Sequence, residues 1–492
     1  MHQCSLNNFK VYWPRKYYES TIKIETLNPC RSENMSNIKN EITISFVGDI
    51  LCWKEQNDIA YDYESDDYDY SSSFKLISKY LDNSDYVVGN LETTLSGIEK
   101  KYTYASETSP YSRIMFNTPD NFAEALKTAG FDLLTTANNH CMDRGSDGTL
   151  RTLSVLEKYS LEHIGTYRSK KDRDAVFIKN IGGFKVAFLN YTHGINYYAH
   201  NNSISIDKQY LVNLLARPES QAYEFGTFPI DMELDKIGKL KYRIFGTDAT
   251  PLDEYRCREV LEDIEKVKVE NPDIIIVLPH MGIQYRQYPS RFSKKWVDFL
   301  FKAGADVIIA SHPHVLQPME FKTIVDADGS ERIGFVIYSM GNFITSPLYE
   351  PTDNALASVI LNLHIARGQN DIATISSISF IPTWVQCRDN ADNLNIRTIS
   401  IYDALTDKEI NRLVSETEIR KLPSIHKKLL GLLSGVKYIN MDMKCEYVIT
   451  PVDLKTWNNK LFFLYKKVIA STRIICFALS SLLRAAIGMV RG

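Results

Sequence analysis

Short apolar segments that end directly in polar side chains recur along this chain. The segment at residues 42–47 runs into Gly48 and Asp49, and the segment at residues 274–278 runs into Pro279 and His280. Similar segments lie at residues 86–88, 131–134, 307–310 and 335–338. Apolar runs of this length, bounded by turn residues, are typical of strands that are buried on both faces.

Helical patterns separate these predicted strands. Pro119 is expected to open one helix, which ends near Gly130, and Trp296 belongs to another that ends before Gly304. A third pattern carries apolar residues at helical spacing through residues 150–159. Alternating strands and helices predict an α/β layered fold, with central, mainly parallel β-sheets flanked by helices.

The polar residues that follow the predicted strands form one set. In parallel sheets, ligands gather at the carboxyl ends of the strands. Carboxylate, carboxamide and imidazole groups are the ligand types that hold Mn²⁺, Fe or Zn²⁺. A single such histidine is more often a hydrogen-bonded core residue, but four of the ten histidines here follow strands together with acids, which favours a metal site. The set is Asp49, Glu92, Asn139, His140, His280, His312 and His314.

Composition excludes several classes of protein. The net charge is −3, so no global positive field attracts nucleic acid. No run of about twenty uncharged apolar residues predicts a transmembrane helix. Residues 1–40 lack an apolar core of signal-peptide length, so we expect no signal peptide and a cytoplasmic protein, with peripheral membrane association as a further expectation.

Three regions are predicted along the chain. Residues 1–40 read as an irregular extension, residues 41–400 as the main domain with an insertion at about 200–250, and residues 420–492 as a basic amphipathic C-terminal appendage. On a helix, Lys466, Arg473, Arg484 and Arg491 would share one face. Such a helix can lie on an anionic membrane surface, or it can pack on the core or on another subunit.

Six motifs in a fixed order carry a family resemblance. They span about residues 42–385, and although each is weak alone, the ordered set is specific. The chain resembles CapA-type capsule-synthesis proteins, which are linked to poly-γ-glutamate production and are related to calcineurin-like metallophosphoesterases. The resemblance implies a metallophosphatase-like version of the layered fold. The motifs are Val47-Gly48-Asp49, Gly89-Asn90-Leu91-Glu92, Ala137-Asn138-Asn139-His140 with Asp143 and Gly145, His280-Met281-Gly282, Ser311-His312-Pro313-His314-Val315-Leu316-Gln317-Pro318 and Tyr338-Ser339-Met340-Gly341-Asn342-Phe343.

The resemblance also implies roles for the site residues. His140 would protonate a leaving group or stabilise charge, and Asp143 could orient its imidazole or could simply form a turn before Gly145. One or two divalent ions (Mn, Fe or Zn) would be bound. The implied ligands are Asp49 and His314 for the first ion, Glu92 as a bridge, and Asn139, His280 and His312 for the second.

The chain departs from the phosphoesterase pattern at three positions. Leu51 stands where a histidine usually follows the first aspartate, Glu92 stands where aspartate is usual, and Ser311 replaces a common glycine. The first ion is therefore left one imidazole short. His193 could also approach the cleft or could be structural, and Gly341-Asn342 is expected to shape a turn.

The leading functional hypothesis is a metal-dependent hydrolase-like protein of capsule or poly-γ-glutamate biosynthesis, which uses a metal-activated water or nucleophile. Its substrate would be an anionic polymer or a phosphate-containing molecule, and no nucleic acid is expected. One alternative is a non-enzymatic component of polymer binding, assembly or export in a membrane-bound amide-ligase complex. The other is a general metallophosphoesterase.

Overall fold

The computed structural model describes residues 40–105, 114–196, 203–216, 252–350, 352–368, 371–434 and 442–451. Residues 1–39, most of the predicted insertion and the basic C-terminal residues Lys466, Arg473, Arg484 and Arg491 lie outside the described residues. What the sequence predicts for these residues therefore remains a prediction.

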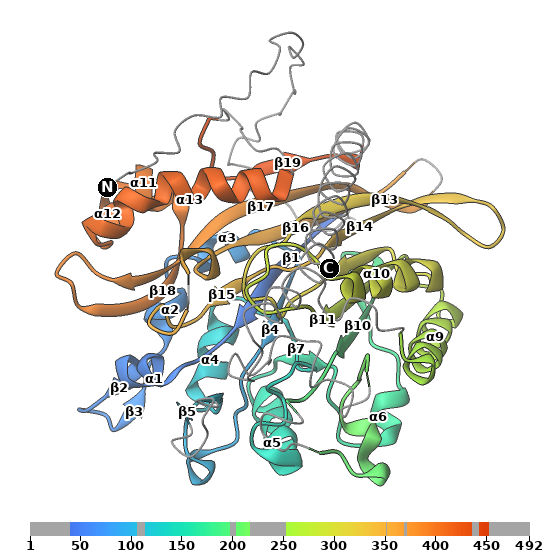
Figure 1. The fold of residues 1–492 in the computed structure, drawn as a ribbon, viewed down its shortest axis with the longest axis horizontal. Coiled ribbons are helices and arrows are strands. Elements are labelled where there is room, and N and C mark those ends of the chain that lie inside the picture. The colour runs from blue at the N-terminus through green and yellow to red at the C-terminus, as the bar shows by residue number, and fades with distance from the viewer. Residues whose placement is uncertain are drawn as a thin grey trace, which may run out of the picture. The chain divides into compact units, whose positions relative to one another are not determined.

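The larger β-sheet is parallel in one half and antiparallel in the other. Among the described residues it holds nine strands, with the order β18-β17-β16-β1-β4-β7-β8, while β15 pairs with β1 and β19 with β17 (Figure 1). Strands β1, β4, β7 and β8 run parallel, as does β15 beside β1. The bounds are β1 Glu41–Ile50, β4 Tyr86–Leu91, β7 Leu133–Thr135, β8 Glu162–Ile164, β15 Asn342–Ile344, β16 Ala357–Arg367, β17 Ala373–Arg388, β18 Leu394–Ser400 and β19 Tyr447–Ile449.

The second sheet has its parallel strands at the centre. Its order over the described chain is β13-β14-β12-β11-β10-β9, with β10, β11, β12 and β14 parallel and the two edge strands antiparallel. The bounds are β9 Ile178–Ile181, β10 Phe184–Thr192, β11 Ile274–His280, β12 Val307–Ile309, β13 Met319–Val325 and β14 Glu331–Ile337.

The two sheets share one apolar core. Strand β11 alternates between two clusters: Ile274 and Ile276 join the cluster that contains residues of both sheets, while Ile275 packs with the helices α9 and α10. The Tyr86 ring in β4 lies 5.7 Å from the Phe188 ring in β10, which bridges the sheets directly. Apolar residues on both faces of β11 thus explain its uninterrupted hydrophobic sequence.

Helices cover the outer faces of the sheets. Helices α9 and α10 lie beside the second sheet, and α13 runs along β16 and β17 (Figure 1). Two short hairpins, β2 Tyr61–Asp62 with β3 Asp67–Tyr68 and β5 Tyr104–Ala105 with β6 Ile114–Met115, complete the strands that the structure describes. The helices are α1 Lys54–Ala60, α2 Ser71–Phe74, α3 Ser78–Leu81, α4 Asn121–Thr128, α5 Gly145–Lys158, α6 Lys170–Asp174, α9 Glu254–Val269, α10 Arg291–Ala303, α11 Ile401–Thr406, α12 Lys408–Asn411 and α13 Glu416–Ser434, with 3₁₀ turns at Ile98–Lys100, Ile206–Leu211 and Asp353–Ala355.

The predicted fold class is confirmed. Each strand and helix that the sequence analysis names is present, with shifts of a few residues at the ends, and the predicted strands pair in parallel in both sheets. Helix α10 ends at Gly304, whose φ of 125° is accessible to glycine at little cost. After residue 416, helix α13 packs against β17 of the larger sheet, and strand β19 pairs with the same strand.

The sequence did not predict the antiparallel extension formed by β16, β17 and β18. These long strands follow one another through short turns, in which Asp371 and Asp392 have φ values of 59° and 64°. Short connections permit only antiparallel pairing, because a parallel crossover needs a dozen or more residues.

One close backbone approach places β1 against the 339–341 segment. The amide of Asp49 donates to the carbonyl of Gly341 at 2.9 Å, and a Cβ on Gly48 would lie only 1.9 Å from that carbonyl oxygen. The register of β1 against β4 also shifts between Phe46 and Asp49. Only glycine therefore fits at position 48, immediately before the first predicted ligand.

We expect Gly48→Ala to destabilise the protein by about 1–3 kcal/mol, because the methyl group meets backbone that cannot rotate away. The measurement is the midpoint of urea unfolding, read by circular dichroism. Gly368→Ala is the matched control, since the nearest atom to its Cβ would lie 3.9 Å away. Equal midpoints for the two variants would contradict the close-approach argument.

Candidate metal centre

The predicted site residues converge at the carboxyl ends of parallel strands. Asp49 lies near the end of β1, Glu92 directly follows β4, and His280 is the last residue of β11. His312 and His314 follow β12 within five residues. All five side chains are buried, with exposed fractions of 8% or less.

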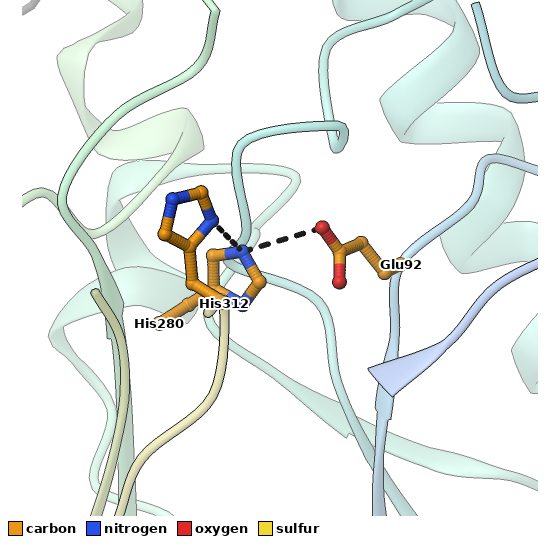
Figure 2. Close-up of side chains that lie close together, drawn as sticks. All are labelled: Glu92, His280 and His312. Atoms are coloured by element: carbon orange, nitrogen blue, oxygen red, sulfur yellow. Dashed lines mark hydrogen bonds and ion pairs between the residues drawn. The ribbon is translucent and has the colours of Figure 1, made fainter. Parts of the chain in front are cut away.

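One ligand group combines Glu92, His280 and His312. Nε2 of His280 lies 3.5 Å from Oε1 of Glu92 and 3.2 Å from Nδ1 of His312. Figure 2 shows the two imidazoles and the carboxylate pointing toward one another. One ligand atom from each residue lies within 4.8 Å of the others, which is a spacing that suits a single cation.

A second ligand group combines Asp49, Glu92 and His314. Nδ1 of His314 lies 3.3 Å from Oδ2 of Asp49, and Nε2 of His314 lies 3.9 Å from Oε1 of Glu92. Ligand atoms of these three residues also lie within 4.8 Å of one another. Glu92 is thus common to both groups, at the position where the sequence analysis expects a bridging carboxylate.

The carboxylate of Glu92 is the test of whether the residues fit a metal. It is completely buried, and neither of its oxygens takes part in a hydrogen bond. Burial, reinforced by the charge of Asp49, raises the pKa of Glu92 well above its usual range. A buried carboxylate without hydrogen-bond donors is costly, and divalent cations would remove that cost, so the donor set fits one or two cations.

The histidines differ in their charge state. Burial and the neighbouring histidines lower the pKa of His280 well below its usual value, which favours the neutral imidazole that binds metals. Burial alone would also lower the pKa of His314, but the negative charges of Glu92 and Asp49 outweigh it and raise that pKa to about 10. His314 therefore supplies positive charge that a bound cation would replace.

The loop after β12 is strained at both of its histidines. His312 has a φ of 104° and His314 a φ of 58°. Non-glycine residues in this region cost of order 1–3 kcal/mol each. The strained loop allows two imidazoles separated by one proline to face different ligand groups.

Asn139, His140 and Asp143 stand beside these groups. Oδ1 of Asn139 lies 2.7 Å from Nε2 of His280, so its amide reaches the first group. Nδ1 of His140 lies 2.7 Å from Oδ2 of Asp143, which also accepts the backbone amide of Phe116 at 2.8 Å. Asp143 thus contacts the His140 imidazole, as the orienting role requires.

Three further residues touch the site. Asn90 donates from Nδ2 to Oδ1 of Asp49 at 2.8 Å, and the same nitrogen lies 3.2 Å from Nδ1 of His280. His193 packs with its ring centroid 4.3 Å from that of His312, and burial lowers its pKa to about 4. Asn342 lies 2.9 Å from Nδ1 of His314. From the sequence, Asn90 was assigned no role and Asn342 was expected to shape a turn, although both residues lie within the family motifs.

Leu51 takes no part in either ligand group. Its side chain is buried and its amide donates to the carbonyl of Ile344 at 3.0 Å. The group around Asp49 therefore has one imidazole, from His314, while the other group has two.

No helix in the described ranges is both long and apolar enough to span a bilayer.

Comparisons with known proteins agree with the resemblance. The chain is 28% identical to "Capsule biosynthesis protein CapA" of Bacillus anthracis over 64% of this chain and 63% of that protein. The match thus spans just under two thirds of that relative's length. It is also 26% identical to "PGA biosynthesis protein CapA" of Bacillus subtilis (strain 168), over 73% of this chain and 76% of that one.

Among solved structures, the chain is similar to the calcineurin-like phosphoesterase YfkN from Bacillus subtilis. That likeness has 15% identity, covers 79% of this chain and 98% of that chain, and gives a TM-score of 0.36. The sulfate thiohydrolase SoxB of Thermus thermophilus gives 12% identity, 70% and 42% coverage, and a TM-score of 0.30.

The family comparison covers more of the chain than any single motif. The family described as "Bacterial capsule synthesis protein PGA_cap" matches residues 43–347 of this chain. This range is more than half of the 492 residues and includes every residue of both ligand groups. The chain belongs to this family of bacterial capsule synthesis proteins.

Proposed function

We propose that this chain is a metal-dependent hydrolase-like enzyme of capsule polymer synthesis. The observation that carries the proposal is Glu92, a buried carboxylate that lacks hydrogen bonds and is shared by two ligand groups. When bound there, divalent cations (Mn, Fe or Zn) would supply Lewis acidity and a site for activating water.

The protein's own residues would bind, orient and move protons. Asp49, His314, His280 and His312 would hold the cations together with Glu92, and Asn139 would add an amide oxygen. His140 is the candidate proton donor. Its Nδ1–H would donate to Asp143, which stabilises the doubly protonated imidazolium, and the Nε2 proton of that imidazolium would be delivered to a leaving group.

The substrate class follows from the family and the charge of the site. An anionic polymer such as poly-γ-glutamate, or a phosphate-containing molecule, presents oxygens that a cation pair would bind. The names of the Bacillus relatives support a role in polymer synthesis. Membrane contact through Lys466, Arg473, Arg484 and Arg491 remains a sequence-based proposal.

One observation favours a second candidate, a non-enzymatic assembly component of a membrane-bound amide-ligase complex. With Leu51 in place of an imidazole, the group around Asp49 would bind its ion more weakly. Normal polymer production by an Asn139→Ala, His140→Ala double mutant would support this candidate. Cleavage of generic phosphodiesters with Mn²⁺ would instead indicate a general metallophosphoesterase.

The first prediction concerns metal content. We expect His280→Ala and His314→Ala each to lower the amount of metal that copurifies with the protein, because each removes an imidazole from one ligand group. The measurement is inductively coupled plasma mass spectrometry of purified protein. His364→Ala is the control, because His364 contacts Thr43 and Ser379 and belongs to neither group. Unchanged metal content in both site variants would defeat the proposal.

The second prediction concerns stability with and without metal. At a free Mn²⁺ concentration about 100-fold above its dissociation constant, the wild-type protein should gain about 2.7 kcal/mol of stability. Glu92→Gln should lose most of this gain, because it removes the shared charge. In EDTA, the variant should be at least as stable as the wild type, since the buried charge is gone. Thermal melts read both effects, and an equal gain from Mn²⁺ in the two proteins would contradict the bridging role.

The third prediction separates chemistry from metal binding. We expect His140→Ala to lower the rate of polymer cleavage by about 10²–10⁴-fold, which is the usual contribution of a general acid. Metal content should not change, because His140 is in neither ligand group. Asp143→Asn should have a smaller effect, since an amide can still contact the imidazole. Cleavage of poly-γ-glutamate, followed by size-exclusion chromatography, gives the rate, and a wild-type rate in His140→Ala would remove the proton-donor role.

A further inference from the structure

The amide of Asn342 has only one orientation that satisfies its neighbours. Its Nδ2 lies 2.9 Å from Oε1 of Glu350 and 3.0 Å from the carbonyl oxygen of Ala355. A backbone carbonyl oxygen can only accept a hydrogen bond, and Oε1 of Glu350 also acts as an acceptor toward Oγ1 of Thr345. Both amide protons of Asn342 are therefore used, and its Oδ1 must face the other way.

That orientation determines a proton on His314. Oδ1 of Asn342 lies 2.9 Å from Nδ1 of His314, and a carbonyl oxygen can only accept. Nδ1 of His314 must therefore carry a hydrogen. The lone pair for a cation is then left to Nε2, which lies 3.9 Å from Oε1 of Glu92.

Glu350 is itself held in place. Its Oε1 accepts from Oγ1 of Thr345 at 2.8 Å, and burial together with the charge of this carboxylate raises the pKa of the nearby Tyr285 hydroxyl. The Tyr285 ring lies 5.8 Å from the His314 ring, so the same tyrosine packs beside the imidazole that Glu350 reaches through Asn342. Glu350 belongs to neither ligand group.

We propose that Glu350 is a positioning residue that acts through Asn342 to fix which nitrogen of His314 faces the metal centre. The inference rests on the proposed function for its purpose, but the hydrogen-bond chain Glu350–Asn342–His314 stands on its own geometry. It matters most in the ligand group of Asp49, Glu92 and His314, to which His314 contributes the single imidazole among the residues that the structure describes. Partners of this kind typically change metal affinity by about 10–100-fold when they are removed.

The experiment compares the full-length wild type with Glu350→Leu, Asn342→Leu and Glu350→Gln in Mn²⁺ titrations followed by electron paramagnetic resonance. Glu350→Leu and Asn342→Leu should weaken one Mn²⁺ site by about 10–100-fold and leave the other unchanged. Glu350→Gln should bind nearly as the wild type does, because the glutamine carbonyl can still accept from Asn342. Glu320→Leu is the matched control, since Glu320 is another partly buried glutamate, which accepts the hydroxyl of Tyr338 at 2.8 Å outside both ligand groups.

A second measurement does not require metal. In metal-free protein labelled with ¹⁵N-histidine, the wild type and Glu350→Gln should show an Nδ1–H signal of His314 that exchanges slowly with water because Asn342 accepts its hydrogen bond, and Glu350→Leu and Asn342→Leu should exchange it faster. The spectrum of His314→Gln assigns the signal. If the wild type binds no Mn²⁺, the proposed function fails, yet this signal still decides the positioning role.

Three results would overturn the inference. The first is Glu350→Leu with an unchanged Nδ1–H signal. The second is Glu350→Leu with unchanged affinity at both Mn²⁺ sites of a metal-binding wild type. The third is equal weakening of both sites in Glu350→Gln and Glu350→Leu with lowered melting temperatures, which would show that Glu350 only supports the fold.

Discussion

A carboxylate that is buried without any hydrogen bond is the constraint on which this site depends. Glu92 lies beside Asp49 in the protein interior, and two acids in such surroundings disfavour each other's charge. Protein chains avoid this arrangement unless positive charge balances it. Here the balance comes partly from His314, whose pKa the two acids raise, and a bound cation would complete it. The placement of Glu92 therefore explains why histidines from β11 and from the loop after β12 converge on it.

The fold supplies the positions of these groups with little freedom. Parallel strands end at one edge of each sheet, and the two sheets share one core, so ligands from β1, β4, β11 and the loop after β12 meet between them. Two energetically unfavourable local features help to set the positions of the ligand side chains. Gly48 allows the backbone of β1 to approach Gly341, and the positive φ angles of His312 and His314 aim neighbouring imidazoles at different groups. Strain of this kind persists only where the surrounding structure enforces it.

The sequence predicted the ligands better than their supports. Ligand types stand directly after apolar runs, and the runs predict strands, so a local pattern carried Asp49, Glu92 and His280 to one site. Asn90 follows the same apolar run as Glu92, but that pattern does not show which side chains it contacts, and Glu350 follows no such run. Their roles depend on contacts between side chains that are distant in sequence, such as Asn90 with His280, and on which end of an amide faces a neighbour. The antiparallel strands β16 to β18 were missed for a related reason: their buried apolar faces resemble those of the parallel strands, and the difference lies in the length of the connecting turns.

The residues that position His314, namely Asn342 and Glu350, also explain how a metal site that lacks one imidazole could still bind a cation in a defined geometry. Leu51 leaves the group around Asp49 with His314 alone, so the orientation of that single ring carries more weight than it would in a site with two. A ring that flipped or changed tautomer would present an N–H to the cation in place of a lone pair. The acceptors around Asn342 oppose this, because Glu350 and the carbonyl of Ala355 use both amide protons and leave only an oxygen for His314. Preorganisation by this hydrogen-bond chain can thus compensate for a ligand that the chain lacks.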